Sequence, residues 1–123
     1  MPPGGRGRKL ELVTALPTGT VTFFFSDIEG STRLLEALGA EYPGLLDRHH
    51  EILRDAFSRC DAVEVGTEGD SFFAVFPSAS EAVGAAVAVQ RALAAAEWPR
   101  ASTVRVRIGI HTGEAGIAGG SYV

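Results

Sequence analysis

A run of strand-forming residues that ends in a carboxylate constrains this chain most. Residues Val21–Ser26 are β-branched or aromatic apart from one serine, a composition typical of a strand, and Asp27 follows directly. Gly30 and Ser31 then introduce a segment with leucines at helical spacing. Because the N–H groups at a helix N-terminus lack partners, a carboxylate delivered beside them favours a site that binds a metal ion and an anion such as phosphate together.

The chain is long enough for one domain with a buried core. It has 123 residues, of which 46% are hydrophobic and 21% are charged, as in ordinary globular proteins. The net charge of -4 argues against direct nucleic-acid binding, and no apolar run reaches the ~20 residues that a membrane span needs. The single cysteine, Cys60, precludes an internal disulfide, so we expect a reducing, cytoplasmic location.

The hydrophobic pattern predicts strands and helices in the order strand, two helical pieces, strand, strand, helix, strand. Ser78 and Glu81 have the spacing of a capping box, which marks the start of the last helix, and Pro99 marks its end. This order is the β-α-β-β-α-β pattern of an α+β, ferredoxin-like fold. The predicted strands are 20–26, 62–65, 71–76 and 104–112, and the predicted helical segments begin at Ser31, Pro43 and Ser78.

The first predicted strand has two partly apolar faces. Because side chains alternate along a strand, Phe23 and Phe25 share the face of Asp27, whereas Phe24 and Ser26 share the opposite face. A strand that buries both faces belongs near the centre of a sheet, so we expect Asp27 to end a central strand.

A second carboxylate, Asp70, follows Gly69 at the mouth of the hairpin predicted between strands 62–65 and 71–76. In a ferredoxin-like sheet the first strand can neighbour the third, which would bring Asp27 and Asp70 to one edge. Two bare carboxylates in contact repel each other, and a divalent metal ion removes that conflict. The alternative interpretation is that each aspartate only caps a helix or a turn.

Three blocks of sequence, Leu16–Leu34, Gly66–Phe73 and Val106–Gly113, carry a resemblance to a known family. In this order they resemble the signature blocks of class III nucleotidyl cyclase catalytic domains, adenylate and guanylate cyclases. The likeness is greatest to the actinobacterial type that often precedes ATPase and helix-turn-helix regulator domains. We therefore expect residues 19–123 to be the N-terminal portion of such a domain, and residues 1–18, rich in Gly, Pro and basic residues, to be a disordered lead-in.

The resemblance implies a head-to-tail homodimer with active sites at its interface, ATP or GTP as substrate, and two Mg²⁺ or Mn²⁺ ions per site. Asp27 and Asp70 match the metal-binding aspartates, and Ile28 matches the residue whose backbone carbonyl binds the second metal. The implied reaction forms pyrophosphate and a 3′,5′-cyclic purine nucleotide, cAMP ahead of cGMP, in signal transduction. The residues that match the triphosphate-binding turn are Glu29, Gly30, Ser31 and Thr32.

Three features depart from the family pattern. Gly66 stands where adenine-selecting cyclases carry a base-binding lysine, and Ser121 aligns with their base-binding aspartate. The asparagine and arginine that orient the ribose and stabilise the transition state would follow Val123. Because removing one such donor typically costs ~10²–10³ in rate, we expect the 123-residue chain alone to be inactive.

The neutral residues at both base-selecting positions also favour an alternative function, a non-catalytic nucleotide-sensing or dimerisation module of a signalling or transcriptional regulator. A different metal-dependent phosphoryl-transfer domain, such as a diguanylate cyclase, is disfavoured because the sequence lacks a Gly-Gly-Asp/Glu-Glu-Phe motif. The run His49, His50 and Glu51 resembles a metal cluster, but adjacent residues on a helix point in different directions. We expect these three residues at the core edge or on the surface.

Overall fold

The structure is a computed structural model that describes residues 16–118, 121 and 122. The lead-in expected at residues 1–18 therefore falls mostly outside the described residues. Four strands form an antiparallel sheet in the order β2-β3-β1-β4. The strands are β1 (Gly19–Ile28), β2 (Val63–Glu68), β3 (Ser71–Phe76), β4 (Val106–Ala115), β5 (Ile117–Ala118) and β6 (Ser121–Tyr122), of which the last two pair separately. The helices are α2 (Ser31–Leu38), α3 (Tyr42–Phe57) and α4 (Ala79–Ala95), with short 3₁₀ turns η1 (Gly39–Glu41) and η2 (Pro99–Ala101).

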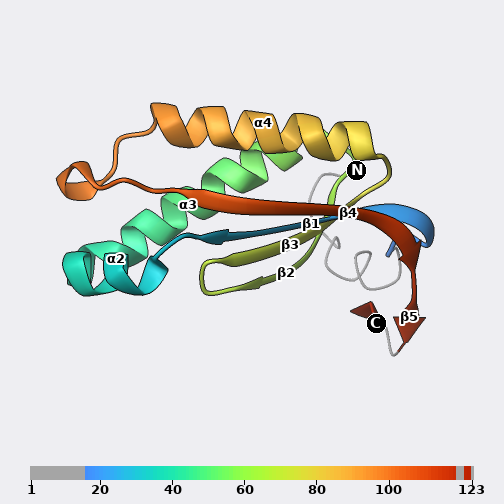
Figure 1. Ribbon diagram of the computed structural model, residues 1–123, viewed down its shortest axis with the longest axis horizontal. Coiled ribbons are helices and arrows are strands. Elements are labelled where there is room, and N and C mark those ends of the chain that lie inside the picture. Colours follow the sequence, from blue (N-terminus) through green and yellow to red (C-terminus); the bar gives the residue numbers. More distant parts are fainter. Residues whose placement is uncertain (1–15, 119–120, 123) are drawn as a thin grey trace, which may run out of the picture.

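The predicted α+β order is confirmed, and β1 occupies the centre of the sheet between β3 and β4. Helices α3 and α4 lie on the same side of the sheet, and α2 extends from the end of β1 (Figure 1). The capping box predicted from the spacing is present, because the amide of Glu81 donates to Ser78 Oγ at 3.3 Å at the start of α4.

The core lies between the sheet and the two long helices. Phe24 of β1 is fully buried there, and its ring meets Phe57 of α3 edge to face, with 5.0 Å between ring centroids. Phe72 and Phe76 of β3 pack against the same Phe57 ring. Removing a buried aromatic side chain of this kind costs about 3–5 kcal/mol, so these contacts fix the helices on the sheet that carries both aspartates.

The hairpin between β2 and β3 is tighter than the sequence predicted. The prediction of a loop at 66–69 is wrong, because β2 continues through Gly66 to Glu68. Only Gly69 and Asp70 form the turn. A shift in pairing register between Glu64 and Gly66 marks a β-bulge that absorbs one residue of the strand. Gly69 has a φ of 58°, a left-handed conformation that favours glycine in a two-residue turn.

The fourth strand is also displaced from its prediction, since β4 begins at Val106 rather than 104 and continues to Ala115. Every residue of β1 from Gly19 to Ile28 pairs with β4, so the pairing of the central strand determines its length. Within residues 16–118, 121 and 122, none of the helices has both the length and the apolar character needed to cross a membrane.

Candidate metal and phosphate site

Strands β1 and β3 bring the two predicted aspartates to the same end of the sheet. The strands are antiparallel, with Ser26 paired to Phe72, so the end of β1 meets the start of β3. The backbone amide of Ile28, the residue after Asp27, donates a hydrogen bond of 2.8 Å to Asp70 Oδ2. The Asp70 carboxylate therefore lies beside the last residues of β1, where the sequence placed it.

The turn between β1 and α2 presents backbone donors next to these carboxylates. Its conformation depends on Gly30, which has a φ of 67° and lies before the first turn of α2. The first helical hydrogen bond joins the Leu34 amide to the Gly30 carbonyl at 3.1 Å. Among the described residues, no side chain caps this helix start. The amides that precede this bond, and so have no carbonyl within the helix to receive their hydrogens, are those of Ser31, Thr32 and Arg33.

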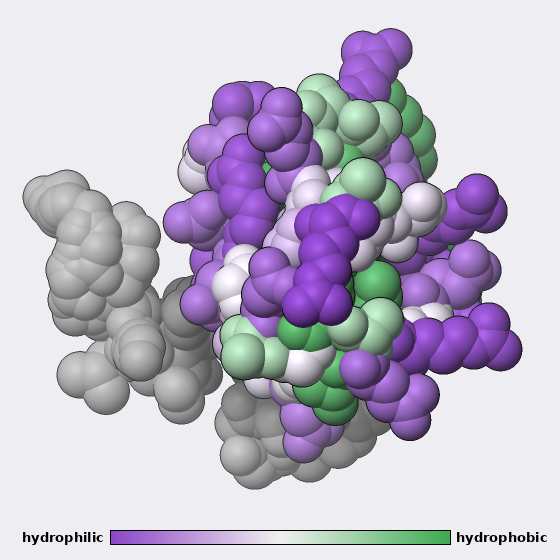
Figure 2. Space-filling view, turned by 90° about the vertical axis from the view of Figure 1, so that its left-hand side faces the viewer, coloured by the Kyte–Doolittle hydropathy of each residue, from purple (hydrophilic) through white to green (hydrophobic). Residues whose placement is uncertain are grey.

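The carboxylates and the turn line one hollow of about 500 Å³. Its volume and its donors suit a phosphate-bearing ligand, because a helix N-terminus offers both free N–H groups and the positive end of the helix dipole. Figure 2 faces this end of the molecule, where hydrophilic side chains surround smaller apolar areas. The lining residues are Asp27, Ile28, Glu29, Gly30, Ser31, Thr32, Arg33, Asp70, Ser71 and Arg107.

Arg107 of β4 is a member of this site that the sequence analysis missed. It pairs across the strands with Asp27, and its guanidinium donates two hydrogen bonds to that carboxylate, at 2.8 and 3.0 Å. The hydrogen bonds and the negative charge of Asp27 raise the pKa of Arg107. The register of β4 against β1 decides this contact, and no local sequence motif reveals that register.

The donors at this end fit a phosphate-bound Mg²⁺ or Mn²⁺ ion. Such ions are held by one or two carboxylates together with substrate phosphates and water, rather than by a cage of protein ligands. The two available carboxylates and the Ile28 carbonyl meet that requirement. In the described part of the chain, no group of three or more His, Cys, Asp or Glu residues converges into a metal site. The guanidinium of Arg107 provides a positive charge beside Asp27.

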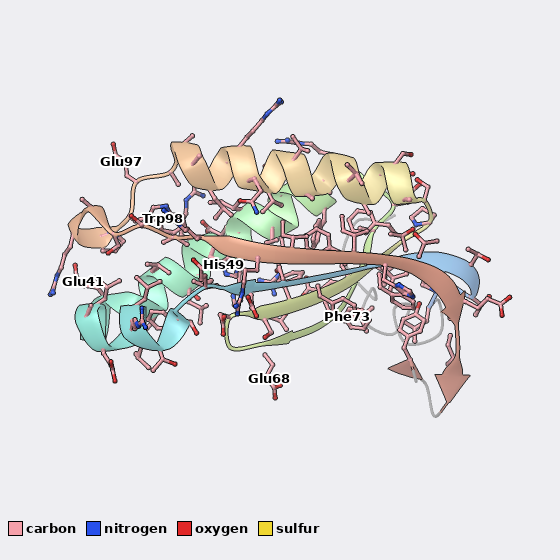
Figure 3. The ribbon with its side chains drawn as sticks, viewed as in Figure 1. Glu41, His49, Glu68, Phe73, Glu97 and Trp98 are labelled. Atoms are coloured by element: carbon pink, nitrogen blue, oxygen red, sulfur yellow. The ribbon has the colours of Figure 1, made fainter. Side chains whose placement is uncertain are left out.

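A second hollow, of about 710 Å³, adjoins the first on the side of the sheet away from α3 and α4. Its floor includes the rings of Phe25 and Phe73, which stack with centroids 4.6 Å apart and planes within 5° of parallel. Figure 3 shows Phe73 on this side of the sheet. Phe25 is 49% exposed, and Asp27 and Arg107 line both hollows.

Comparison with known proteins identifies the family. Residues 13–120 match the family model described as the adenylate and guanylate cyclase catalytic domain. The chain belongs to this family. The resemblance seen in the sequence is thereby confirmed for the family as a whole.

Individual cyclase relatives agree with this assignment. An adenylate cyclase of Lachancea kluyveri is 36% identical over 96 residues, which are 78% of this chain and 5% of that protein. An uncharacterized protein of Mycobacterium tuberculosis is 34% identical over 87% of this chain and 36% of its own length. A solved adenylate cyclase structure from Trypanosoma brucei has a TM-score of 0.76 and 30% identity, and the match covers 83% of this chain and 60% of that one. The chain therefore spans 5% and 36% of the length of the two curated relatives that it matches here.

The two base-selecting positions of the cyclase resemblance differ in how far the structure describes them. Gly66 lines the second hollow at the β2 bulge, opposite Phe73 in the strand pairing. The backbone of Ser121 pairs with Ala118, but the Ser121 side chain lies outside what the structure describes.

Helix α3 contributes polar residues near the candidate site. The expected surface or core-edge location is wrong for His49, which is fully buried between α3 and the sheet (Figure 3). Burial lowers its pKa to about 4, and the charge of neighbouring His50 contributes to this lowering. Burial also raises the pKa of Tyr42, and the negative charge of Asp70 adds to that effect. His49 recurs at helical spacing with Leu45, Ile52 and Ala56, and this apolar stripe accounts for its burial.

Proposed function

We propose that this end of the sheet is the metal- and phosphate-binding part of a nucleotidyl cyclase site, which takes a purine nucleoside triphosphate. The observation that carries the proposal is the Ile28–Asp70 hydrogen bond, which fixes Asp70 against the residue that follows Asp27, in a hollow lined by both aspartates and by the start of α2. Family membership supports the reaction class, formation of a 3′,5′-cyclic nucleotide and pyrophosphate.

Asp27, Asp70 and the carbonyl of Ile28 would hold the two Mg²⁺ or Mn²⁺ ions that the resemblance implies. When bound, such ions lower the pKa of the ribose 3′-hydroxyl and neutralise charge on the phosphates. The carboxylates themselves supply the negative charge that makes this end attractive to a divalent cation, and the Ile28 amide holds Asp70 in place.

The turn Glu29–Thr32 and Arg107 would bind the triphosphate. The free amides at the start of α2 donate to phosphate oxygens without a large conformational change, because their direction is already fixed by the helix. Arg107 lies at the boundary of both hollows, where its guanidinium would donate hydrogen bonds to the phosphates. Guanidinium groups bind phosphate through paired hydrogen bonds.

The second hollow would receive the purine. The exposed ring of Phe25 offers a stacking surface, and stacking accepts adenine and guanine alike. Gly66 supplies no side chain to read the base, so we propose weak discrimination, with cAMP ahead of cGMP as product. The variant Gly66→Lys tests this point: no atom lies within 4 Å of an added Cβ there, so a base-binding lysine fits. We expect it to raise the preference for ATP over GTP, and an unchanged preference would contradict the placement of the base.

A second copy of this chain would cover the second hollow. The stacked rings of Phe25 and Phe73 leave an aromatic surface on the face of the sheet away from α3 and α4. Head-to-tail pairing of two copies over this face would cover the rings and close the second hollow.

Nucleotide binding tests the proposal. A fluorescent ATP analogue should bind the 123-residue chain only when Mn²⁺ is present, because the carboxylates repel an unaccompanied triphosphate. Binding that is absent, or that is equal with and without Mn²⁺, would contradict the proposal. The same samples should contain no cyclic nucleotide, since the resemblance places the ribose-orienting asparagine and the transition-state arginine outside this sequence.

The second candidate function is a non-catalytic nucleotide-sensing or dimerisation module of a regulator. The Gly66 position favours it, because a site without a base-reading side chain suits sensing as well as turnover. It predicts metal-dependent nucleotide binding in a protein that contains the whole catalytic domain, with no cyclic product under any metal.

A further inference from the structure

The turn that carries Asp70 is held from outside the hairpin by helix α3. His50 Nε2 lies 3.1 Å from the backbone carbonyl oxygen of Gly69, the residue immediately before Asp70. A carbonyl oxygen only accepts hydrogen bonds, so Nε2 must carry the hydrogen and donate it. The contact joins residues 19 positions apart and reaches the middle of a two-residue turn.

The ring of His50 is itself fixed in orientation. His49 packs on it with ring centroids 5.1 Å apart, and Phe72 of β3 lies 6.0 Å away. His49 is fully buried, and within the described part of the chain neither of its ring nitrogens has a hydrogen-bond partner. Because burial lowers its pKa to about 4, His49 is neutral near pH 7. It therefore packs against the His50 ring without placing a second positive charge beside it.

Helix α3 is also fastened to the hairpin at a second point, one helical turn further on. Arg54 donates two hydrogen bonds to the Glu64 carboxylate of β2, at 2.9 and 3.0 Å. The helix therefore provides a fixed base from which His50 reaches the turn. Groups that hold a metal ligand by fixing its neighbours commonly set metal affinity, because a ligand that must be ordered on binding binds more weakly.

We propose that His50 is a positioning residue, which holds the Gly69 carbonyl so that the Asp70 carboxylate stays beside Asp27 for metal binding. The inference rests on the proposed metal site for its consequence, but the positioning of Asp70 is a property of the metal-free chain. Without the bond to Gly69, the turn is restrained only by its own hairpin and by the Ile28 amide.

The test compares His50→Phe and His50→Gln in the whole 123-residue chain. Phenylalanine keeps a ring beside Phe72 and removes the donor, whereas glutamine keeps an amide donor near the position of Nε2. We expect His50→Phe to speed hydrogen exchange of the Ile28 amide, which donates to Asp70, while amides in α4 exchange as before. We expect Mn²⁺ affinity, measured from the free-ion EPR signal, to fall about tenfold or more. His50→Gln should restore most of both properties.

The matched control is His111→Phe, the same substitution at an exposed histidine of β4 whose ring stacks on Phe23. It should leave both readouts unchanged. The inference would be overturned if the Ile28 amide exchanges at the same rate in folded His50→Phe as in the unaltered chain. It would also be overturned if His50→Gln does not restore the slower exchange of the unaltered chain. If the Ile28 exchange responds but the unaltered chain binds no Mn²⁺, the proposed function fails while the positioning of Asp70 by His50 stands.

Discussion

The Ile28 amide donates a 2.8 Å hydrogen bond to Asp70 Oδ2, although the two residues lie 42 positions apart. This bond makes the end of β1 and the turn before β3 a single unit. It satisfies a backbone donor just where the strand ends, and it fixes the Asp70 carboxylate in the hollow that Asp27 also lines. The position of the proposed metal site therefore follows from the pairing of two strands.

Arg107 competes with a metal ion for Asp27, which gives Arg107→Gln two opposite effects. Mn²⁺ affinity without nucleotide should rise about twofold to fivefold, because the exposed ion pair it replaces is weak. Affinity for the Mn²⁺–ATP analogue should fall about tenfold, since a charged phosphate donor is lost. Calorimetric titration of both ligands measures the two changes. A fall in both affinities would show that Arg107 organises Asp27 rather than competing at it.

Gly30 has a left-handed conformation that other residues adopt at a cost. Gly30→Ala should lower the free energy of unfolding by about 1–2 kcal/mol, measured by urea denaturation, and should weaken nucleotide binding. The matched control is Gly44→Ala, at a glycine inside α3 that also has no atom within 4 Å of an added Cβ. It should be neutral or stabilising by up to about 1 kcal/mol. Equal losses at both sites would contradict the role assigned to the turn conformation.

Burial of His49 predicts a specific dependence of stability on pH. Its pKa is lowered from 6.5 to about 4, so between these pH values the unfolded chain binds a proton that the folded chain does not. The free energy of unfolding should therefore fall as the pH falls from 6.5 to 4, by up to about 3 kcal/mol in total. The loss is complete below pH 4 and absent above pH 6.5.

The variant His49→Leu isolates this effect from the titration of other groups. Leucine removes two buried nitrogens that have no partner among the described residues, so it should also stabilise the chain near neutral pH. Urea unfolding at several pH values measures both changes. If the free energy of unfolding of His49→Leu falls between pH 6.5 and 4 as steeply as that of the unaltered chain, the pH dependence belongs to other residues.

The exposed ring of Phe25 should contribute to pairing between two copies of the chain. Phe25→Ser should weaken self-association roughly tenfold in sedimentation equilibrium, because about 1–2 kcal/mol of apolar burial is lost. Val83→Ser removes an apolar side chain of similar exposure, 52%, from the outer face of α4 and should have no effect. Association that depends on Val83 and not on Phe25 would contradict this pairing, because it would place the contact between copies on the outer face of α4.

The sequence predicted those parts of the fold that local chemistry determines. Helix α2 begins at Ser31 as predicted, and Ser78 caps the start of α4 through its contact with Glu81. The position of Asp70 at a hairpin turn followed from Gly69. These features depend on turn and cap preferences that a few neighbouring residues carry.

The features that the sequence did not predict depend on register and depth. The bulge before Gly66 extends β2 and tightens the turn, and nothing in the local pattern distinguishes it from a longer loop. Arg107 faces Asp27 only because β4 pairs with β1 in one particular register. The divergence of adjacent side chains on a helix predicts a core-edge or surface position for His49, yet the packing of α3 on the sheet buries it completely.

Titration of Mn²⁺ into the unaltered chain and into Asp27→Asn and Asp70→Asn tests whether both aspartates hold the metal ion. Asparagine keeps the size of each side chain, and at position 70 it keeps an acceptor for the Ile28 amide, so the fold should persist. The unaltered chain should bind Mn²⁺. Each single substitution should weaken Mn²⁺ binding at least tenfold, because both carboxylates hold the metal ion. Mn²⁺ affinity that is unchanged in either folded variant would contradict a site shared between Asp27 and Asp70.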